Sequence, residues 1–263
     1  MSTLSLVIPA HNEATELEGT ITALYEALTA AHIPNEILVI NDNSSDDTER
    51  VLNELKSRVP TLRYVNNLPP HGFGFAVRKG LEIFEGDIVA IVMADASDRP
   101  EDVVAFYKVM QERRVDCVFG TRWSDGGFVV DYPTPKKVMN RLANKFIQAM
   151  FLTRYNDMTN AFKMYRRDAI EGFRPLLSYH FNLTVELPLK AMVRGYTYVV
   201  LPNGWVNRKT GVSKLKIKEM GSRYLFIVLY CWIEKWLARG DYHQTRRPPI
   251  SHNVQAMPTK NAN

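Results

Sequence analysis

The stretch Asp87-Ile-Val-Ala-Ile-Val-Met-Ala-Asp95-Ala-Ser-Asp98-Arg-Pro100 indicates the fold class more directly than any other part of the chain. Residues 88–93 form a nearly continuous apolar run with branched side chains, which is typical of a strand buried on both faces of a sheet. The run ends at Asp95, and Pro100 with the acidic residues after it predicts the first turn of a helix. Open α/β sheets place their chemistry where a buried strand ends just before a helix. The alternative is that Asp95 only caps a turn.

The segments before and after this stretch alternate between strand and helix patterns. Asn12 is predicted to cap the first helix, and the polar run that begins at Asn41 is predicted to cap the second. This β-α alternation predicts a mostly parallel sheet flanked by helices. The predicted strands are residues 4–8, 36–40, 62–65, 88–93 and 116–122.

Length and composition describe an ordinary globular protein. The 263 residues favour one large domain or one domain with an appendage, and 46% hydrophobic residues are ample for a core. Two cysteines, Cys117 in a predicted strand and Cys231 in a predicted helix, predict neither a disulfide framework nor a zinc site. The first residues lack a basic start followed by a long apolar run, so we expect no signal peptide and a cytoplasmic location.

Positive charge is concentrated near the carboxyl terminus. The net charge is +5, but residues 205–247 hold ten Lys/Arg against three acidic residues (10 − 3 = +7), which leaves −2 for the rest of the chain. A local basic patch indicates phosphates, anionic lipid or nucleic acid as partners. We expect no nucleic-acid binding, because the basic residues belong to no recognition module.

A second unusual stretch is Tyr224 to Ile233, which is uncharged and apolar within a helix predicted over residues 222–239. Ten residues cannot cross a hydrocarbon core of about 30 Å, which needs about 20. The helix is therefore either part of the core or amphipathic at a membrane interface, and its aromatic residues and flanking cations favour the interface. We expect three regions: a domain over 1–215, an interfacial helix region over 216–242 and a disordered tail over 243–263.

Four blocks, in this order, resemble the family-two glycosyltransferases, and most closely the dolichol- or polyprenol-phosphate sugar synthases. The resemblance covers about residues 4–215 and extends to two later segments, one of which has Asn160-Ala161 where the family has Ser-Gly. The blocks are Val7-Ile-Pro-Ala-His-Asn-Glu13, Val39-Ile-Asn-Asp-Asn-Ser-Ser-Asp-Asp-Thr48, Gly72-Phe-Gly-Phe-Ala-Val-Arg-Lys-Gly80 and Met93-Ala-Asp-Ala-Ser-Asp-Arg-Pro-Glu101, and the later segments are Asp157-Met-Thr-Asn-Ala-Phe-Lys-Met-Tyr165 and Arg208-Lys-Thr-Gly-Val-Ser-Lys214.

The resemblance implies a GT-A type fold: a Rossmann-like, mostly parallel α/β sheet flanked by helices that binds a sugar nucleotide. It implies that Asp42 accepts hydrogen bonds from the nucleobase and that Asp95 faces the diphosphate through Mg²⁺ or Mn²⁺. Ser97 stands where the family has a second carboxylate, so we expect Ser97 to reach the metal directly or through water, or Asp98 to compensate. Two spaced glycines at a helix start also permit close approach to a phosphate. The remaining residues expected to bind substrate are Pro9, Asn12, Glu13, Gly74 and Lys79.

The acceptor is expected to be a polyprenyl or dolichyl phosphate. Such an acceptor is already anionic and needs cations rather than a base, and Arg122 is one candidate. A glycan hydroxyl acceptor would instead need a base, for which Asp157 or Glu186 is the candidate. A third possibility is a non-catalytic relative, because Ser97 replaces a carboxylate. The cations and hydroxyl of the later loop that would hold a lipid phosphate are Arg208, Lys209, Ser213 and Lys214.

The resulting prediction is an inverting glycosyltransferase that uses a GDP- or UDP-linked sugar. The basic loop and the short apolar helix together favour a peripheral enzyme on the cytoplasmic face of a membrane. The sugar, the nucleobase and the oligomeric state stay open at this point.

Overall fold

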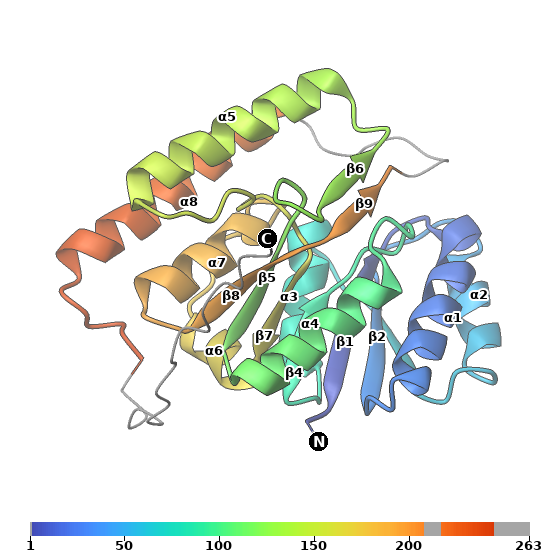
Figure 1. The fold of residues 1–263 in the computed structure, drawn as a ribbon. Helices are drawn as coiled ribbons and strands as arrows, with labels where there is room; N and C mark the ends of the chain where they lie inside the picture. The colour runs from blue at the N-terminus through green and yellow to red at the C-terminus, as the bar shows by residue number, and fades with distance from the viewer. Residues whose placement is uncertain (1, 208–216, 245–263) are drawn as a thin grey trace, which may run out of the picture.

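The computed structural model describes residues 2–207 and 217–244, with side chains described for 2–207 and 221–244. A seven-stranded sheet in the order β3-β2-β1-β4-β7-β5-β8 forms the centre of the molecule (Figure 1). All neighbouring pairs are parallel except those of β7, which is antiparallel to β4 and β5, so the predicted mostly parallel α/β sheet is confirmed. The strands are β1 Leu4–Ala10, β2 Asn35–Asn41, β3 Leu62–Asn66, β4 Ile88–Ile91, β5 Cys117–Thr121, β7 Lys163–Arg166 and β8 Tyr198–Pro202.

One face of the sheet is covered by α1 Ala14–Ala30, α2 Thr48–Leu55 and α4 Pro100–Arg113. Side chains alternate between the two faces along a strand, so Leu4, Leu6 and Ile8 of β1 pack in this core while Val7 packs in the other. The strand expected over residues 88–93 is buried on both faces as predicted, although its hydrogen-bonded part is only four residues long.

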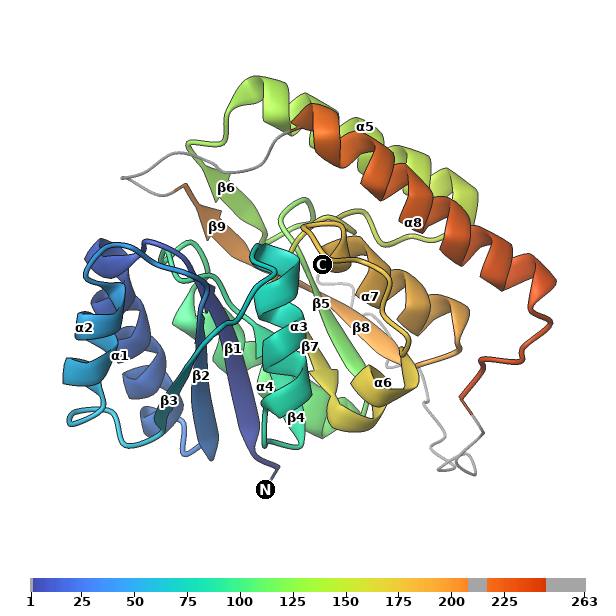
Figure 2. The same cartoon turned by 180° about the vertical axis from the view of Figure 1, so that it is seen from behind.

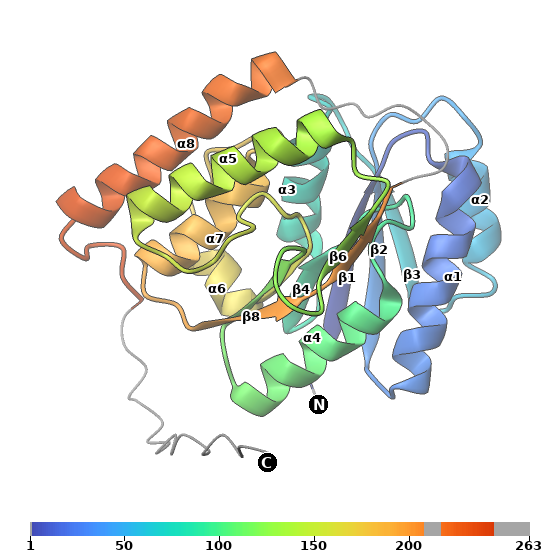
Figure 3. The ribbon, with the colours of Figure 1, turned by 45° about the horizontal axis from the view of Figure 1, so that its top comes forward.

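The opposite face carries α3 Phe73–Ile83, α5 Thr134–Phe151, α6 Arg167–Gly172, α7 Leu183–Val193 and α8 Ile217–Leu237. Figures 2 and 3 show α5 and α8 running side by side on the outside of this layer, with α7 between α8 and the sheet. A small parallel ribbon of β6 Phe128–Val130 and β9 Gly204–Val206 stands above the sheet.

Helix α8 has two different sides. Ile227, Val228 and Cys231 are buried in the core, and Glu234 forms a buried ion pair with Arg194 of α7. The other side exposes large apolar residues, and its place at a membrane interface stays a prediction. Among the described residues, no helix has an apolar stretch long enough to cross a bilayer.

The division expected between residues 215 and 216 stays a prediction, because residues 208–216 lie outside the described part of the chain. Residues 245–263, nearly all of the expected tail, lie outside it as well. His243 and Gln244, at the start of that region, hydrogen-bond to the carbonyls of Val193 and Arg194 at the end of α7. Both cysteines are free and buried, as expected from their number and spacing.

Candidate functional site

The candidate site lies at the edge of the sheet where the parallel strands end. Asp42 follows β2, Asp95 lies just beyond β4, and Arg122 follows β5. Because β7 runs antiparallel, the segment before it, which includes Asp157, reaches the same edge. Since β7 lies between β4 and β5, those two strands are about 10 Å apart, two strand spacings. This edge is where the predicted site residues were expected to meet.

Asp42 is the most fully hydrogen-bonded residue of the predicted nucleotide site. Its Oδ1 accepts from Asn67 Nδ2 at 2.8 Å and lies 3.0 Å from His71 Nδ1, and its Oδ2 accepts from Gly72 N at 2.6 Å. Asp42 therefore holds the loop before α3 in place and remains at the sheet edge where a base was expected. Its contact with a nucleobase stays a prediction.

The turn between β1 and α1 is bound by the loop after β2. The amide of Asn12 donates to Ser44 Oγ and the amide of Glu13 donates to Thr48 Oγ1, both at 3.0 Å. The Asn12 side chain accepts from Ser45 N at 2.7 Å instead of capping α1, so its predicted role as N-cap is wrong. Pro9 is buried inside β1. The block Val39–Thr48 thus supplies the hydrogen-bond partners for the two amides just before α1. The sequence alone did not indicate this pairing.

Gly72, just before α3, and Gly74, within it, are required for different structural reasons. Gly72 has a φ of 131°, which favours glycine, and its amide binds Asp42. A Cβ on Gly74 would lie 2.2 Å from the carbonyl carbon of Tyr179, so the close approach expected for a phosphate is made there by the protein backbone. Lys79 is partly buried on α3, and its role in substrate binding stays a prediction.

Asp95, Ser97 and Asp98 lie together on the turn after β4. Asp95 Oδ1 accepts from Ser97 N at 3.2 Å, and Asp98 Oδ2 accepts from Met93 N at 2.9 Å. Burial, with the nearby charge of Asp95, raises the pKa of Asp98 to about 7. The hydroxyl of Ser97 is buried and has no hydrogen-bond partner among the described residues. The Ser97 hydroxyl is therefore a second candidate metal ligand, at the position where the family has a carboxylate.

These three groups offer oxygen ligands, which suit a hard divalent cation such as Mg²⁺ or Mn²⁺. Within the described residues, no group of three or more His, Cys, Asp or Glu side chains is placed to hold a metal. A cation at this turn would therefore take its remaining ligands from the substrate, as Mg²⁺ does at phosphate sites.

Arg122 and Asp157 form a buried ion pair. The guanidinium donates from Nε and Nη2 to the two carboxylate oxygens at 2.8 Å each, and the amide of Arg122 adds a bond of 3.0 Å. Burial alone would lower the pKa of Arg122, but the charge of Asp157 raises it above its usual range. With both oxygens occupied by Arg122, Asp157 is a poor general base, contrary to the role expected for it with a hydroxyl acceptor.

Glu186 is also committed to partners inside the protein. It is fully buried on α7, accepts from the amides of Leu177 and Ser178 at 2.7 Å each, and pairs with Lys190 at 2.7 Å. It holds the segment before α7 against that helix. The geometry therefore does not support the expectation that Glu186 acts as a base.

A cluster of cations around Trp123 was not recognised in the sequence. The side chains of Arg122, Lys137 and Arg141 lie 5.6, 5.5 and 5.2 Å from the Trp123 ring. The indole N–H of Trp123 is buried and has no hydrogen-bond partner in the described part of the chain. A run of lysine and arginine in the amphipathic helix pattern after Pro135 was the only available signal, and it does not reveal which ring the cations surround.

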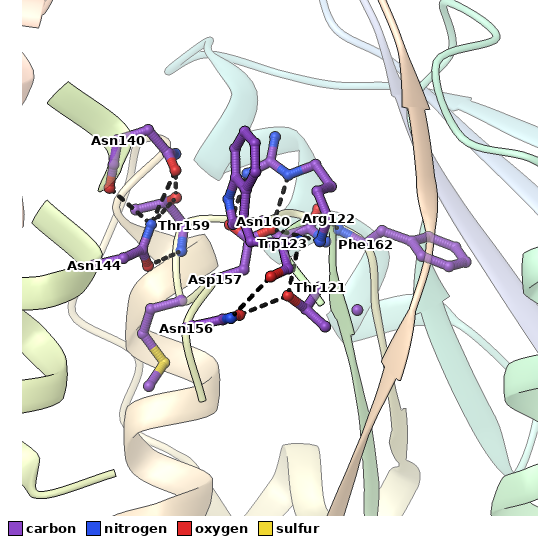
Figure 4. A network of polar contacts seen from close by, with 12 residues as sticks. Thr121, Arg122, Trp123, Asn140, Asn144, Asn156, Asp157, Thr159, Asn160 and Phe162 are labelled. Atoms are coloured by element: carbon purple, nitrogen blue, oxygen red, sulfur yellow. Dashed lines mark hydrogen bonds and ion pairs between the residues drawn. The ribbon is translucent and has the colours of Figure 1, made fainter. Parts of the chain in front are cut away.

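Polar side chains fasten α5 to this cluster, as Figure 4 shows. Asn140 and Asn144 of α5 donate to Thr159 Oγ1 at 2.6 and 3.1 Å, and Arg141 donates to the carbonyl of Asn156. Thr121 in turn donates to Asn156 Oδ1 at 2.6 Å. The middle of α5 is thereby fixed relative to Arg122 and Asp157.

Strand β9, the last described segment before the basic loop expected to hold a phosphate, contacts the Asp95 turn. Val206 of β9 donates to the carbonyl of Ser97 at 3.3 Å, and Gly204 donates to Asp102 at 2.9 Å. The predicted residues of that loop lie outside the described residues: Arg208, Lys209, Ser213 and Lys214.

Comparison with known proteins identifies relatives over most of the chain. The family model described as glycosyl transferase family 2 matches residues 5–173. The polyprenol monophosphomannose synthase of Mycolicibacterium smegmatis is 26% identical over 216 residues, 80% of each chain. The undecaprenyl-phosphate mannosyltransferase of Micrococcus luteus is 24% identical over 237 residues, 88% of this chain and 94% of that protein.

Among solved structures, the chain resembles glucosyl-3-phosphoglycerate synthase from Mycobacterium tuberculosis in complex with Mn²⁺, UDP-glucose and phosphoglyceric acid. The TM-score is 0.67 at 16% sequence identity, and the match covers 88% of this chain and 80% of that one. At this identity the likeness supports the fold and not the substrate.

Proposed function

The chain belongs to glycosyl transferase family 2 and is a glycosyltransferase, and we propose that it moves a sugar from a nucleotide sugar to a polyprenyl phosphate with inversion. The observation that carries the choice of acceptor is the convergence of Arg122, Lys137 and Arg141 on Trp123, at the same sheet edge as Asp95. The names of the two relatives, a polyprenol monophosphomannose synthase and an undecaprenyl-phosphate mannosyltransferase, support the same acceptor class.

The donor nucleotide is proposed to lie over the ends of β1, β2 and β4. Asp42 is buried there as an acceptor for a nucleobase N–H, with Asn12 and Glu13 beside it on the neighbouring turn. Both guanine and uracil present N–H groups to a carboxylate, so this geometry is compatible with a GDP- or a UDP-linked sugar.

A divalent cation held by Asp95, with Ser97 and Asp98 as further oxygen ligands, would neutralise the departing nucleoside diphosphate. The buried hydroxyl of Ser97, which has no hydrogen-bond partner among the described residues, and the adjacent carboxylates support this placement. The related glucosyl-3-phosphoglycerate synthase was solved with Mn²⁺, which is consistent with Mg²⁺ or Mn²⁺ here.

The acceptor phosphate is proposed to bind the cations around Trp123. The charge of Arg122 is balanced by Asp157. Among the described residues, Lys137 and Arg141 make no ion pair, so a bound anion would balance their charge. The indole N–H of Trp123, unpartnered within the described part of the chain, offers a further donor to a phosphate oxygen. The later basic loop, with Arg208, Lys209, Ser213 and Lys214, remains a proposed second clamp on the same phosphate.

The reaction then needs no general base. A phosphate oxygen attacks the anomeric carbon, the bond from that carbon to the diphosphate oxygen breaks, and the electron pair leaves with the nucleoside diphosphate. The engagement of Asp157 by Arg122 and of Glu186 by Lys190 disfavours a hydroxyl acceptor, which would require deprotonation.

The proposed route for a lipid acceptor is the outer side of α5 and α8, here called the α5/α8 surface. Helix α5 contains four Lys/Arg and no Asp or Glu, which suits an anionic leaflet. We therefore propose peripheral binding to the cytoplasmic face of a membrane. The exposed apolar residues of the α5/α8 surface are Val138, Met139, Leu142, Phe146, Leu225, Phe226, Leu229, Trp232, Ile233, Trp236 and Leu237.

The test is sugar transfer to undecaprenyl phosphate in detergent, with GDP-mannose, UDP-glucose and related donors offered with Mg²⁺ or Mn²⁺ and products detected by mass. The expected result is a glycosyl phospholipid from one donor class, absent with Asp95→Asn. Donor hydrolysis that depends on Asp95, with no lipid product from any donor, would overturn the acceptor assignment. Neither transfer nor hydrolysis would instead indicate a non-catalytic relative.

A further inference from the structure

A pocket of about 440 Å³ lies between the segment before α7 and the first half of α8. Leu177, Tyr179 and Phe226 supply most of its apolar lining, and Asn182, His180 and Arg223 supply polar groups. The volume lies in the range of small-ligand sites, and the lining combines three largely apolar side chains with four polar ones. No part of the donor or phosphate sites described above uses it.

One wall of the pocket is held rigidly. The amides of Leu177 and Ser178 are bound by Glu186, and Phe181 stacks on Phe73 of α3 with ring centroids 4.3 Å apart. The Tyr179 ring lies under the Arg78 guanidinium at 4.2 Å. Gly74 allows this backbone to lie directly against α3. The wall therefore has a fixed shape without any ligand.

The facing wall is tied to the first. Tyr224 of α8 donates to the carbonyl of Phe181 at 3.2 Å, and Asn182 donates to the carbonyl of Arg223 at 3.4 Å. Phe226 is 60% exposed, so the same side chain belongs both to the pocket and to the α5/α8 surface. The pocket therefore opens onto the apolar surface of α8 at one side and abuts the start of α3 at the other.

We propose that this pocket binds the isoprene units next to the phosphate of the acceptor lipid. This inference rests on the proposed function. An apolar chain fits because the apolar lining continues through Phe226 onto the α5/α8 surface, while the phosphate itself would stay on the cations around Trp123. The pocket would then distinguish a phosphate that carries several isoprene units from one that carries a single unit, whether or not a membrane is present.

The test uses the full chain without membranes, with farnesyl phosphate and dimethylallyl phosphate as monomeric acceptors. We expect Phe226→Ala and Tyr179→Ala to raise KM for farnesyl phosphate about tenfold, to change KM for dimethylallyl phosphate little, and to leave donor hydrolysis unchanged. Phe226→Trp, which narrows the pocket, should also raise KM for farnesyl phosphate. The matched control is Leu152→Ala, since Leu152 is 82% exposed and lines a different pocket at the far end of α5.

A diazirine analogue of farnesyl phosphate gives a binding readout that needs no turnover. Photolabelling within residues 177–182 or at Phe226 would support the proposal, and labelling confined to other segments would overturn it. If the native protein transfers sugar to farnesyl phosphate and the pocket variants behave like Leu152→Ala, the pocket assignment fails while the proposed function stands. If the native protein transfers sugar to no isoprenyl phosphate, both fail.

Discussion

The two halves of the chain distribute charge and apolar surface in opposite ways. In the N-terminal half, residues 2–113, every Arg–carboxylate ion pair has a partner at least 36% exposed, and Leu68 is the one exposed large hydrophobic residue described. In the C-terminal half, residues 117–207 and 217–244, three ion pairs are buried: Arg122–Asp157, Lys190–Glu186 and Arg194–Glu234. The exposed apolar residues gather on α5 and α8.

The two halves are therefore suited to different partners. The N-terminal half has a charged exterior and an apolar interior, as expected for a part of the protein that faces water. The groups proposed to bind the nucleotide lie at its sheet edge. A half that buries charge and exposes tryptophan and phenylalanine suits an anionic ligand and an apolar surface.

Arg194→Met should lower the free energy of unfolding by about 3–5 kcal/mol, because Glu234 would remain buried without its partner. Arg58→Met, which breaks the exposed pair between the turn after α2 and Glu18 of α1, should cost no more than about 1 kcal/mol. Urea unfolding of the two variants measures both. Equal losses would remove the contrast between the halves.

Asp95→Asn should reduce sugar transfer by a factor on the order of 10²–10³, with donor hydrolysis falling by the same factor, because the leaving group loses its stabilisation. Its counterpart in the other half is Arg141→Ala, which removes a cation near Trp123. We expect Arg141→Ala to lower transfer while donor binding stays unchanged, as measured by calorimetry with the nucleotide sugar. Loss of donor binding in Arg141→Ala would contradict the division of labour between the halves.

Trp232→Asp should weaken binding to anionic vesicles about tenfold, because Trp232 lies on the exposed side of α8 and a carboxylate would oppose insertion. Ala105→Asp places the same charge on exposed α4 of the N-terminal half, and its vesicle binding should match that of the native protein. Sedimentation with phosphatidylglycerol vesicles compares the three proteins. Equal behaviour of the two variants would mean that α8 is not the membrane-facing side.

Lys163 tests the buried charge of the C-terminal half by its pH dependence. Burial lowers its pKa to about 7, although its Nζ donates to the carbonyls of Met158, Asn160 and Thr184. Between pH 7 and about 10, the unfolded chain binds a proton that the folded chain lacks, so folding stability should rise with pH by at most about 1.4 kcal/mol per unit. Lys163→Met should remove this rise, and Lys108→Met on exposed α4 should retain it.

Much of the N-terminal half could be predicted because its signals are local. The apolar run before Asp95 and the proline after it specify a strand and a helix start within fifteen residues. The expected disposition of Asp42 and Asp95 follows once the strands are parallel. The side-chain role of Asn12 was wrong because its partner, Ser45, comes from a loop more than thirty residues away.

The C-terminal half was harder to predict because its contacts are non-local. Nothing near residue 163 signals that β7 inserts antiparallel between β4 and β5, yet that insertion brings Asp157 to Arg122. In the sequence alone, the carboxylate of Asp157 is a candidate base. Its ion pair with Arg122 is recognised only in the folded structure. The cations around Trp123 likewise meet only after α5 folds back over the sheet.

The central claim is that the acceptor is a lipid phosphate. The most direct measurement offers the enzyme, with its preferred nucleotide sugar and Mg²⁺ or Mn²⁺, equal concentrations of undecaprenyl phosphate, undecaprenol and an oligosaccharide, and identifies every product by mass. Our account predicts one product, the glycosyl phosphate ester, because the site holds an anion with cations and keeps Asp157 and Glu186 occupied. Sugar attached to a hydroxyl of undecaprenol or of the oligosaccharide would contradict it.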